Sequence, residues 1–124
     1  KDISMEQLTP QEETVMQHIW QIGKCAIKDV VEKMAEPKPP YTTVASIFAN
    51  LEKKEYLTMR RFGNVKVYTP IITEGAYKRH FLSDVVKSYF NDSYKDLVSF
   101  FVKDQKITKE ELTEIIELIE KNRK

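Results

Sequence analysis

The sequence predicts a mainly α protein with a small β-hairpin wing, built as a winged helix-turn-helix followed by a three-helix dimerisation region. Two observations support this fold class. Three short amphipathic segments precede two alternating strands around Gly63-Asn64, which is the element order of a winged helix. Three further amphipathic segments then fill the rest of the chain. We therefore expect a winged-helix domain over residues 1–73 and a helical dimerisation domain over residues 74–124.

The first helix has clear signals at both ends. Thr9 is a suitable N-cap, Pro10 takes the first helical position, and Glu12 completes a capping box. Gly23 ends the helix, so we expect it to run from Pro10 to about Ile22. Its apolar stripe, which we assign to the core, comprises Val15, Met16, Ile19 and Trp20.

The next two helices complete a helix-turn-helix. Residues 26–34 form a short second helix with one apolar face, comprising Ile27, Val30, Val31 and Met34. A proline-rich stretch that ends at Pro40 then forbids helix, and Thr42 or Thr43 is expected to cap a third helix. The residues that this helix directs inward are Val44, Ile47, Phe48 and Leu51.

A β-hairpin follows, because residues 56–62 and 65–69 alternate apolar and polar side chains on either side of Gly63-Asn64. Residues 38–79, which contain the hairpin, carry eight basic and three acidic side chains, whereas the whole chain has a net charge of +1. Any polyanion that the chain binds is therefore expected at this middle segment.

Three amphipathic helices are expected after Pro70. Thr73 caps the first, and Asn91-Asp92-Ser93 separates it from the second. Thr108 and Glu111 form a capping box that opens the third. About 50 residues of such helices are too few to close a core alone, so we expect a partner surface, most simply a second copy of the chain. The expected dimer interface comprises Tyr89, Phe90, Tyr94, Leu97, Phe100, Phe101, Ile115, Ile116 and Ile119.

The winged-helix order places the third helix in the major groove of double-stranded DNA. Asn50 is the best base reader on its outer face, because asparagine contacts adenine bidentately. Basic side chains beside the hairpin tip are expected to contact phosphates, whereas Lys53 and Lys54 are equally suited to favouring the helix dipole. The expected DNA-binding residues are Thr42, Thr43, Ser46, Asn50, Lys53, Lys54, Arg60, Arg61 and Lys66.

The residue pattern does not indicate an enzyme. His18 and His80 have no carboxylate or cysteine ligand pattern around them, so no metal site is expected. With three glycines in the chain, no phosphate-binding loop stands out. Cys25 is the single cysteine, interpreted as a buried thiol that cannot form an internal disulfide. Without a signal segment or a membrane-length apolar run, we expect a cytoplasmic protein that needs no cofactor.

Two stretches of the chain resemble a known family. Leu8 to Trp20 contains a Val-Met-x-x-Ile-Trp helix, and Tyr41 to Lys54 contains Thr-Val-x-x-x-Phe-x-x-Leu-x-Lys-Lys before a basic wing. Together they resemble the penicillinase and methicillin-resistance repressor family over nearly the whole chain. The resemblance implies a dimeric repressor of a β-lactam-resistance-type or related operon, released when a membrane sensor protease causes its cleavage.

The chain departs from the family pattern at several positions. Ala45 and Asn50 stand where staphylococcal members have arginine, so its operator need not be theirs. The family's scissile Asn-Phe bond corresponds to Phe100-Phe101, which is the candidate cleavage site here. A copper-responsive branch carries paired cysteines near its C-terminus, and this chain has none after Cys25, which disfavours copper sensing.

The sequence therefore predicts a sequence-specific DNA-binding transcriptional repressor that acts as a homodimer on a pseudo-palindromic operator. Two alternatives stay open. One is a winged-helix regulator that binds a small molecule within the aromatic-rich second part of the chain. The other is a winged helix that serves protein–protein assembly without binding DNA.

Overall fold

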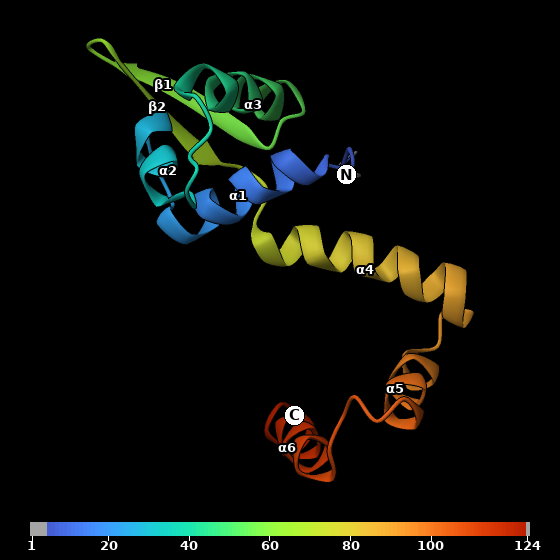
Figure 1. Ribbon diagram of the computed structural model, residues 1–124. Helices are drawn as coiled ribbons and strands as arrows, with labels where there is room; N and C mark the ends of the chain where they lie inside the picture. Colours follow the sequence, from blue (N-terminus) through green and yellow to red (C-terminus); the bar gives the residue numbers. More distant parts are fainter. Residues whose placement is uncertain (1–4, 124) are drawn as a thin grey trace. The chain divides into compact units, whose positions relative to one another are not determined.

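The computed structural model describes residues 5–123, which form six helices and one two-stranded antiparallel sheet (Figure 1). Contacts divide this part of the chain into two compact units, of which unit 1 ends at Arg79 and unit 2 begins at His80. The predicted fold class is confirmed, because a hairpin follows the third helix and three helices follow the hairpin. The elements are α1 (Pro10–Ile22), α2 (Ile27–Lys33), α3 (Tyr41–Lys53), β1 (Leu57–Phe62), β2 (Val65–Pro70), α4 (Glu74–Phe90), α5 (Tyr94–Lys103) and α6 (Lys109–Lys121).

Both expected ends of α1 are present. The Thr9 amide donates to Oε1 of Glu12 at 2.9 Å, and the Glu12 amide donates to the Thr9 hydroxyl at 3.2 Å, which completes the capping box. At the other end, Gly23 has a φ of 87° and its amide donates to the Ile19 carbonyl at 2.6 Å. Glycine adopts a positive φ at little cost, so it ends the helix.

The start of α3 differs from the expectation. Pro40, with a φ of −61° and a ψ of 147°, is the N-cap, and its carbonyl accepts the amides of Thr43 and Val44. The prediction that Thr42 or Thr43 caps this helix is wrong. The proline holds an extended backbone immediately before Tyr41, so its carbonyl receives the first helical hydrogen bonds without a side-chain cap.

Lys38 ties the proline-rich loop back onto α2. Its ammonium group donates to three carbonyls at the end of that helix, at 3.2, 3.0 and 2.7 Å, namely those of Val31, Glu32 and Met34. The last carbonyls of a helix have no intrahelical partner and carry partial negative charge, so they favour a cation. Lys38 therefore fixes the loop that leads into α3.

The hairpin predicted around Gly63-Asn64 is confirmed. β1 and β2 pair antiparallel across this two-residue turn, where Gly63 has a φ of 63°. Tyr68 on β2 also exchanges two backbone hydrogen bonds with Cys25, at 2.9 and 2.7 Å. The residue pair Cys25 and Tyr68 thus fastens the wing to the segment just before α2.

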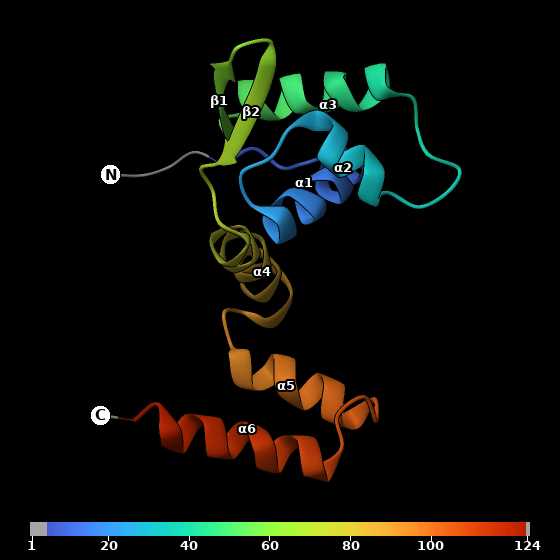
Figure 2. The same cartoon turned by 90° about the vertical axis from the view of Figure 1, so that its left-hand side faces the viewer.

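The core of unit 1 lies around α3, which packs on α1, α2 and β1 (Figure 2). The ring of Phe48 meets the ring of Tyr68 edge to face at 4.8 Å, which joins α3 to the wing. The indole N–H of Trp20 donates to the Ile72 carbonyl at 2.9 Å. The largest side chains that are almost fully buried include Val15, Met16, Ile19, Val30, Val44, Phe48, Leu51, Tyr56 and Leu57.

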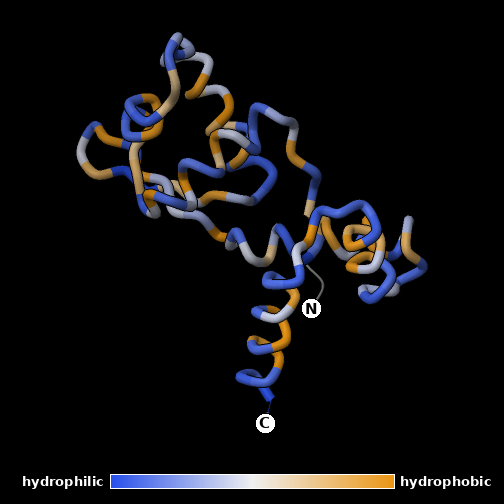
Figure 3. The backbone as a smooth tube through the Cα atoms, turned by 60° about the horizontal axis from the view of Figure 1, so that its bottom comes forward, coloured by the Kyte–Doolittle hydropathy of each residue, from blue (hydrophilic) through white to orange (hydrophobic). Residues whose placement is uncertain are grey.

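Unit 2 consists of capped amphipathic helices with little buried surface. The capping box expected of Thr108 and Glu111 is present, and the Thr73 hydroxyl accepts the Ala76 amide at 3.1 Å as expected before α4. The Ser93 hydroxyl also accepts the Asp96 amide at 3.0 Å, which is a cap that was not predicted from the sequence. Neither α5 nor α6 buries a residue, and Figure 3 shows hydrophobic residues along one side of the last helix. Within the described residues, no helix is long and apolar enough to span a membrane.

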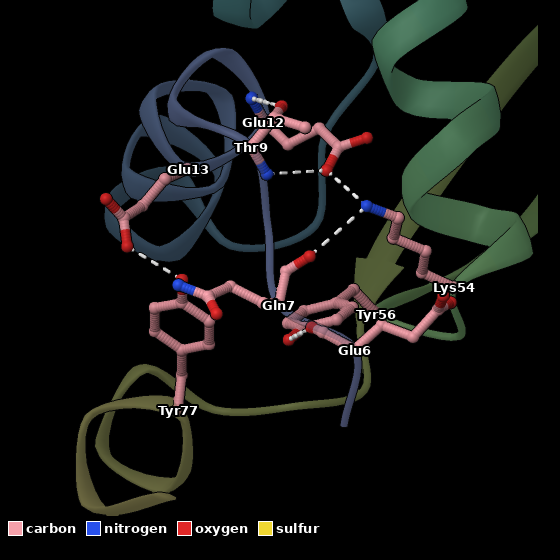
Figure 4. Close-up of polar contacts among 8 residues, drawn as sticks. All are labelled: Glu6, Gln7, Thr9, Glu12, Glu13, Lys54, Tyr56 and Tyr77. Carbon is pink, nitrogen blue, oxygen red and sulfur yellow. Dashed lines mark hydrogen bonds and ion pairs between the residues drawn. The ribbon is translucent and has the colours of Figure 1, made fainter. Parts of the chain in front are cut away.

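A partly buried ion pair joins the start of α1 to the end of α3 (Figure 4). Nζ of Lys54 lies 2.6 Å from Oε1 of Glu12, and their side chains are 21% and 6% exposed. Burial by itself would raise the pKa of the Glu12 carboxyl. The hydrogen bonds from Lys54 and the Thr9 amide, together with the nearby ammonium charge, outweigh it and bring the pKa below its ordinary 4.5. The ionised carboxylate therefore stabilises the folded state.

We expect Lys54→Met to lower the free energy of unfolding by about 2 kcal/mol near neutral pH, because it leaves the Glu12 carboxylate partly buried without its cation. Chemical denaturation followed by circular dichroism measures the change. Lys53→Met is the matched control, since Lys53 is exposed on the same helix, and it should cost less than about 0.5 kcal/mol.

The pH dependence of this difference has a definite sign. Because folding lowers the pKa of Glu12, its contribution is present above the unfolded pKa and is lost as pH falls through the folded pKa. The difference in the free energy of unfolding between the native chain and the Lys54→Met variant should therefore shrink as pH falls below 4.5. A gap that stays constant under acid conditions would contradict the assigned role of the pair.

Candidate nucleic-acid interface

The outer face of α3 is polar and exposed. Val44, Ile47 and Leu51 are buried against the core, which turns the opposite side of the helix outward. Ser46 and Asn50 lie one turn apart on that side. The exposed polar side chains of the helix include Thr42, Thr43, Ser46, Asn50 and Lys53, all of them among the expected DNA-binding residues.

The two faces of the wing carry different cations. Arg61 pairs directly with Lys66 across the hairpin, whereas Arg60 pairs with Val67. Side chains alternate between faces along a strand, so Arg61 and Lys66 share the face that buries Leu57 and Tyr68 against the helices. Arg60 lies on the opposite face. The exposed tip of the inner face is therefore the strongly basic part of the wing.

A groove of about 470 Å³ separates the wing tip from the helices. Lys66 lines it from β2, and Tyr41 and Ala45 line it from α3. Sequence reasoning did not place Lys28 and Asn64 here, because only the fold brings the start of α2 beside the hairpin turn. The lining residues are Ala26, Ile27, Lys28, Tyr41, Ala45, Asn64, Val65 and Lys66.

The cations around this groove have no acidic partners among the described residues. The ion pairs among the described residues join Lys54 to Glu12, Lys78 to Glu74 and Arg123 to Glu120. None of them involves Lys28, Arg61 or Lys66. Like charges directly opposite each other on a hairpin destabilise it, so an anion bound between Arg61 and Lys66 would relieve their repulsion. This geometry suits a phosphate group.

Lys54 differs from the other basic side chains expected to bind DNA. Its ammonium group turns toward Glu12 and the Gln7 carbonyl, at 2.6 and 3.3 Å, and is mostly buried there (Figure 4). Lys53, one residue earlier, is exposed. Of the two neighbouring lysines, only Lys53 is left to face a ligand at the outer surface of α3.

The single cysteine of the chain, Cys25, is buried. Burial raises the pKa of the Cys25 thiol to about 11, with a smaller contribution from Asp29, so the thiolate nucleophile is disfavoured. Within residues 5–123, no three histidine, cysteine or carboxylate side chains gather in a geometry suited to a metal ion. The groove at the wing combines basic side chains with an open shape, so it is the candidate site for an anion.

Comparisons with known proteins agree with the resemblance seen in the sequence. A family model described as penicillinase repressor matches residues 8–121. The penicillinase repressor of Bacillus licheniformis is 27% identical over 125 residues, which cover 95% of this chain and 94% of that protein. A solved structure described as "CopR Repressor Structure" is 26% identical, covers 57% of this chain and 97% of its own, and gives a TM-score of 0.43. The family match therefore extends over both units.

Proposed function

The chain belongs to the penicillinase repressor family, and on this premise we propose that it represses transcription by binding double-stranded operator DNA as a homodimer. In this proposal residues 1–73 read the DNA and residues 74–124 pair two subunits. The operator is pseudo-palindromic, the protein acts in the cytoplasm, and the regulated genes form a β-lactam-resistance-type or related operon. Membership of a family of repressors also supports a regulatory role for the chain over an enzymatic one.

The observation that carries the proposal is the cationic pair at the wing tip. Arg61 and Lys66 stand opposite each other on the inner face of the hairpin, without an acidic partner among the described residues. Beside them runs a groove bounded by α3. A DNA strand in this groove would place a phosphate at the pair and a major-groove edge at α3.

Sequence recognition is assigned to the outer face of α3. Asn50 has both a donor and an acceptor on its side-chain amide, and it is exposed one turn beyond Ser46. Thr42, Thr43 and Lys53 complete the proposed contact surface, with Arg60 reaching DNA from the outer face of the wing. Lys54 is left out, because its ion pair with Glu12 occupies it.

Pairing of subunits is assigned to the apolar side of unit 2. Several of its large apolar side chains are well exposed: Tyr89 is 78% exposed, Ile116 56% and Ile119 59%. Ile116 and Ile119 lie three residues apart, so they share one face of α6. Apolar surface gathered on helices that bury nothing is typical of an interface. The proposed interface comprises Tyr89, Phe90, Tyr94, Leu97, Phe100, Phe101, Ile115, Ile116 and Ile119.

Release from DNA is assigned, by family resemblance, to cleavage between Phe100 and Phe101 after a membrane sensor protease is activated. Both residues lie within α5, and their side chains are 51% and 39% exposed. Proteases act on extended backbone, so cleavage at this bond requires α5 to open locally. The Phe100 ring also contacts the Phe90 ring at 5.7 Å, which would resist that opening.

The proposal is tested by a mobility shift with DNA from upstream of the chain's own gene, against random DNA as competitor. Two half-sites about one helical turn apart, protected together in a footprint, are the expected result. Failure to bind this DNA at low salt, with dimers intact, would contradict the proposal and favour a role in protein–protein assembly.

The wing makes a separate prediction. Arg61→Ala combined with Lys66→Ala should weaken binding to all DNA sequences and lower the slope of log affinity against log salt by about two, since each lost phosphate contact contributes close to one. Arg60→Ala, on the other face, should change the slope less. An unchanged slope in the double variant would show that the inner face of the wing does not contact DNA phosphates.

Asn50→Ala should reduce affinity for the cognate operator by about 1 to 3 kcal/mol and leave affinity for random DNA nearly unchanged, because a base contact is lost. Lys53→Ala is the contrast, since loss of a phosphate contact weakens binding to both DNAs alike. Parallel titrations by fluorescence anisotropy measure both. Equal losses on the two DNAs with Asn50→Ala would mean that Asn50 contacts the DNA phosphate backbone and not a base.

The apolar side of α6 makes the last prediction of this function. Ile116→Glu combined with Ile119→Glu should convert dimers to monomers in sedimentation, because two charges would be buried in the interface. Operator affinity should then fall about 100-fold or more, since one molecule no longer engages two half-sites. Lys121→Glu, on the opposite side of α6 from the apolar stripe, is the control that should remain dimeric.

A further inference from the structure

A second groove in unit 1 lies where the base of the wing meets the first turn of α4. Its volume is about 740 Å³, within the range of small-molecule sites. Leu57 and Ile72 lie buried at this groove, while Ile71 is 52% exposed. It shares no lining residue with the groove assigned to DNA. The interior is therefore an apolar surface of ligand size that the proposed function does not use.

The charge at this groove is entirely negative. Glu52 and Glu55 are its charged lining residues, and neither forms an ion pair within the described part of the chain. α3 ends at Lys53, so the negative end of its dipole lies at the same place. Two cations lie between these glutamates in the sequence: Lys54 is turned toward Glu12, and Lys53 is exposed on the outer face of α3 and does not line the groove. A positive charge placed here would meet two exposed carboxylates that form no ion pair with another described residue.

The remaining walls suit an apolar body of adaptable shape. Met5 and Met59 line the groove, and methionine side chains are flexible and polarisable enough to fit ligands of differing outline. A hydrated metal ion would leave the apolar walls uncovered. An apolar anion would be repelled by the glutamates, and a neutral molecule would gain no attraction from these two exposed carboxylates.

We propose that this groove binds a lipophilic organic cation, whose apolar body covers Leu57, Ile71 and Ile72 while its charge lies beside Glu52 and Glu55. The site lies wholly within unit 1 and does not depend on DNA binding or on pairing of subunits. Met59 adjoins Arg60 on β1, so an occupied groove touches the strand that carries the wing cations.

Tetraphenylphosphonium and tetraphenylborate provide the test, because they match in size and shape and differ in the sign of charge. In calorimetric titrations of the full chain, we expect saturable binding of the phosphonium at one site, about tenfold tighter than any binding of the borate. The net charge of the chain is +1, so a preference for the cation must come from the local carboxylates. Equal or tighter binding of the borate, or no saturable binding of the phosphonium at millimolar concentration, would overturn the proposal.

Substitutions then locate the site. Glu52→Gln combined with Glu55→Gln should weaken phosphonium binding about tenfold and remove the preference over the borate. Glu32→Gln combined with Glu36→Gln makes the same change of charge at exposed residues outside the groove and should have no effect. Ala76→Trp, which fills the groove from α4, should abolish binding, and Thr58→Trp does so from β1 if the first variant unfolds. Unchanged affinity in the Gln pair, or in a folded Trp variant, would refute the assignment.

Discussion

The attachment of Tyr68 to the rest of unit 1 is the constraint on which the proposed DNA-binding surface depends. Its backbone pairs with Cys25 and its ring packs on Phe48, so one residue of β2 is held both by the segment before α2 and by α3. Because side chains alternate along a strand, burying Tyr68 puts Lys66 on the same face, and the pairing register brings Arg61 with it. A shift of one residue would turn both cations away from α3.

A second constraint separates the basic side chains that stabilise the fold from those left for a ligand. Lys54 and Lys38 both contact groups of the chain itself, a carboxylate in one case and helix-end carbonyls in the other. Each holds one end of the helix-turn-helix in place, since Lys54 anchors the end of α3 and Lys38 anchors the loop before it. Arg61 and Lys66, which form no ion pair among residues 5–123, are therefore held in a fixed position relative to these helices.

Local signals in the sequence were enough to locate most elements. Thr9 with Glu12, and Thr108 with Glu111, begin their helices as expected, because a capping box satisfies backbone amides within four residues. The N-cap at Pro40 was missed, since a backbone carbonyl replaces the side-chain cap that the pattern seeks. The ion pair of Lys54 and the position of Lys28 depend on segments far apart in the chain, which periodicity cannot bring together.

The same limit explains why pairing of subunits has to be argued from energetics. Caps define where α5 and α6 begin, yet neither helix buries a residue, and an apolar side left exposed in this way is typical of an interface. A single wing and a single α3 give few contacts, and phosphate contacts weaken steeply with salt. The twofold dimer that we propose would cover the apolar side and double the proposed DNA-binding surface in one step. Under the proposed function, tight binding to the operator therefore requires both the exposed isoleucines of α6 and the basic wing.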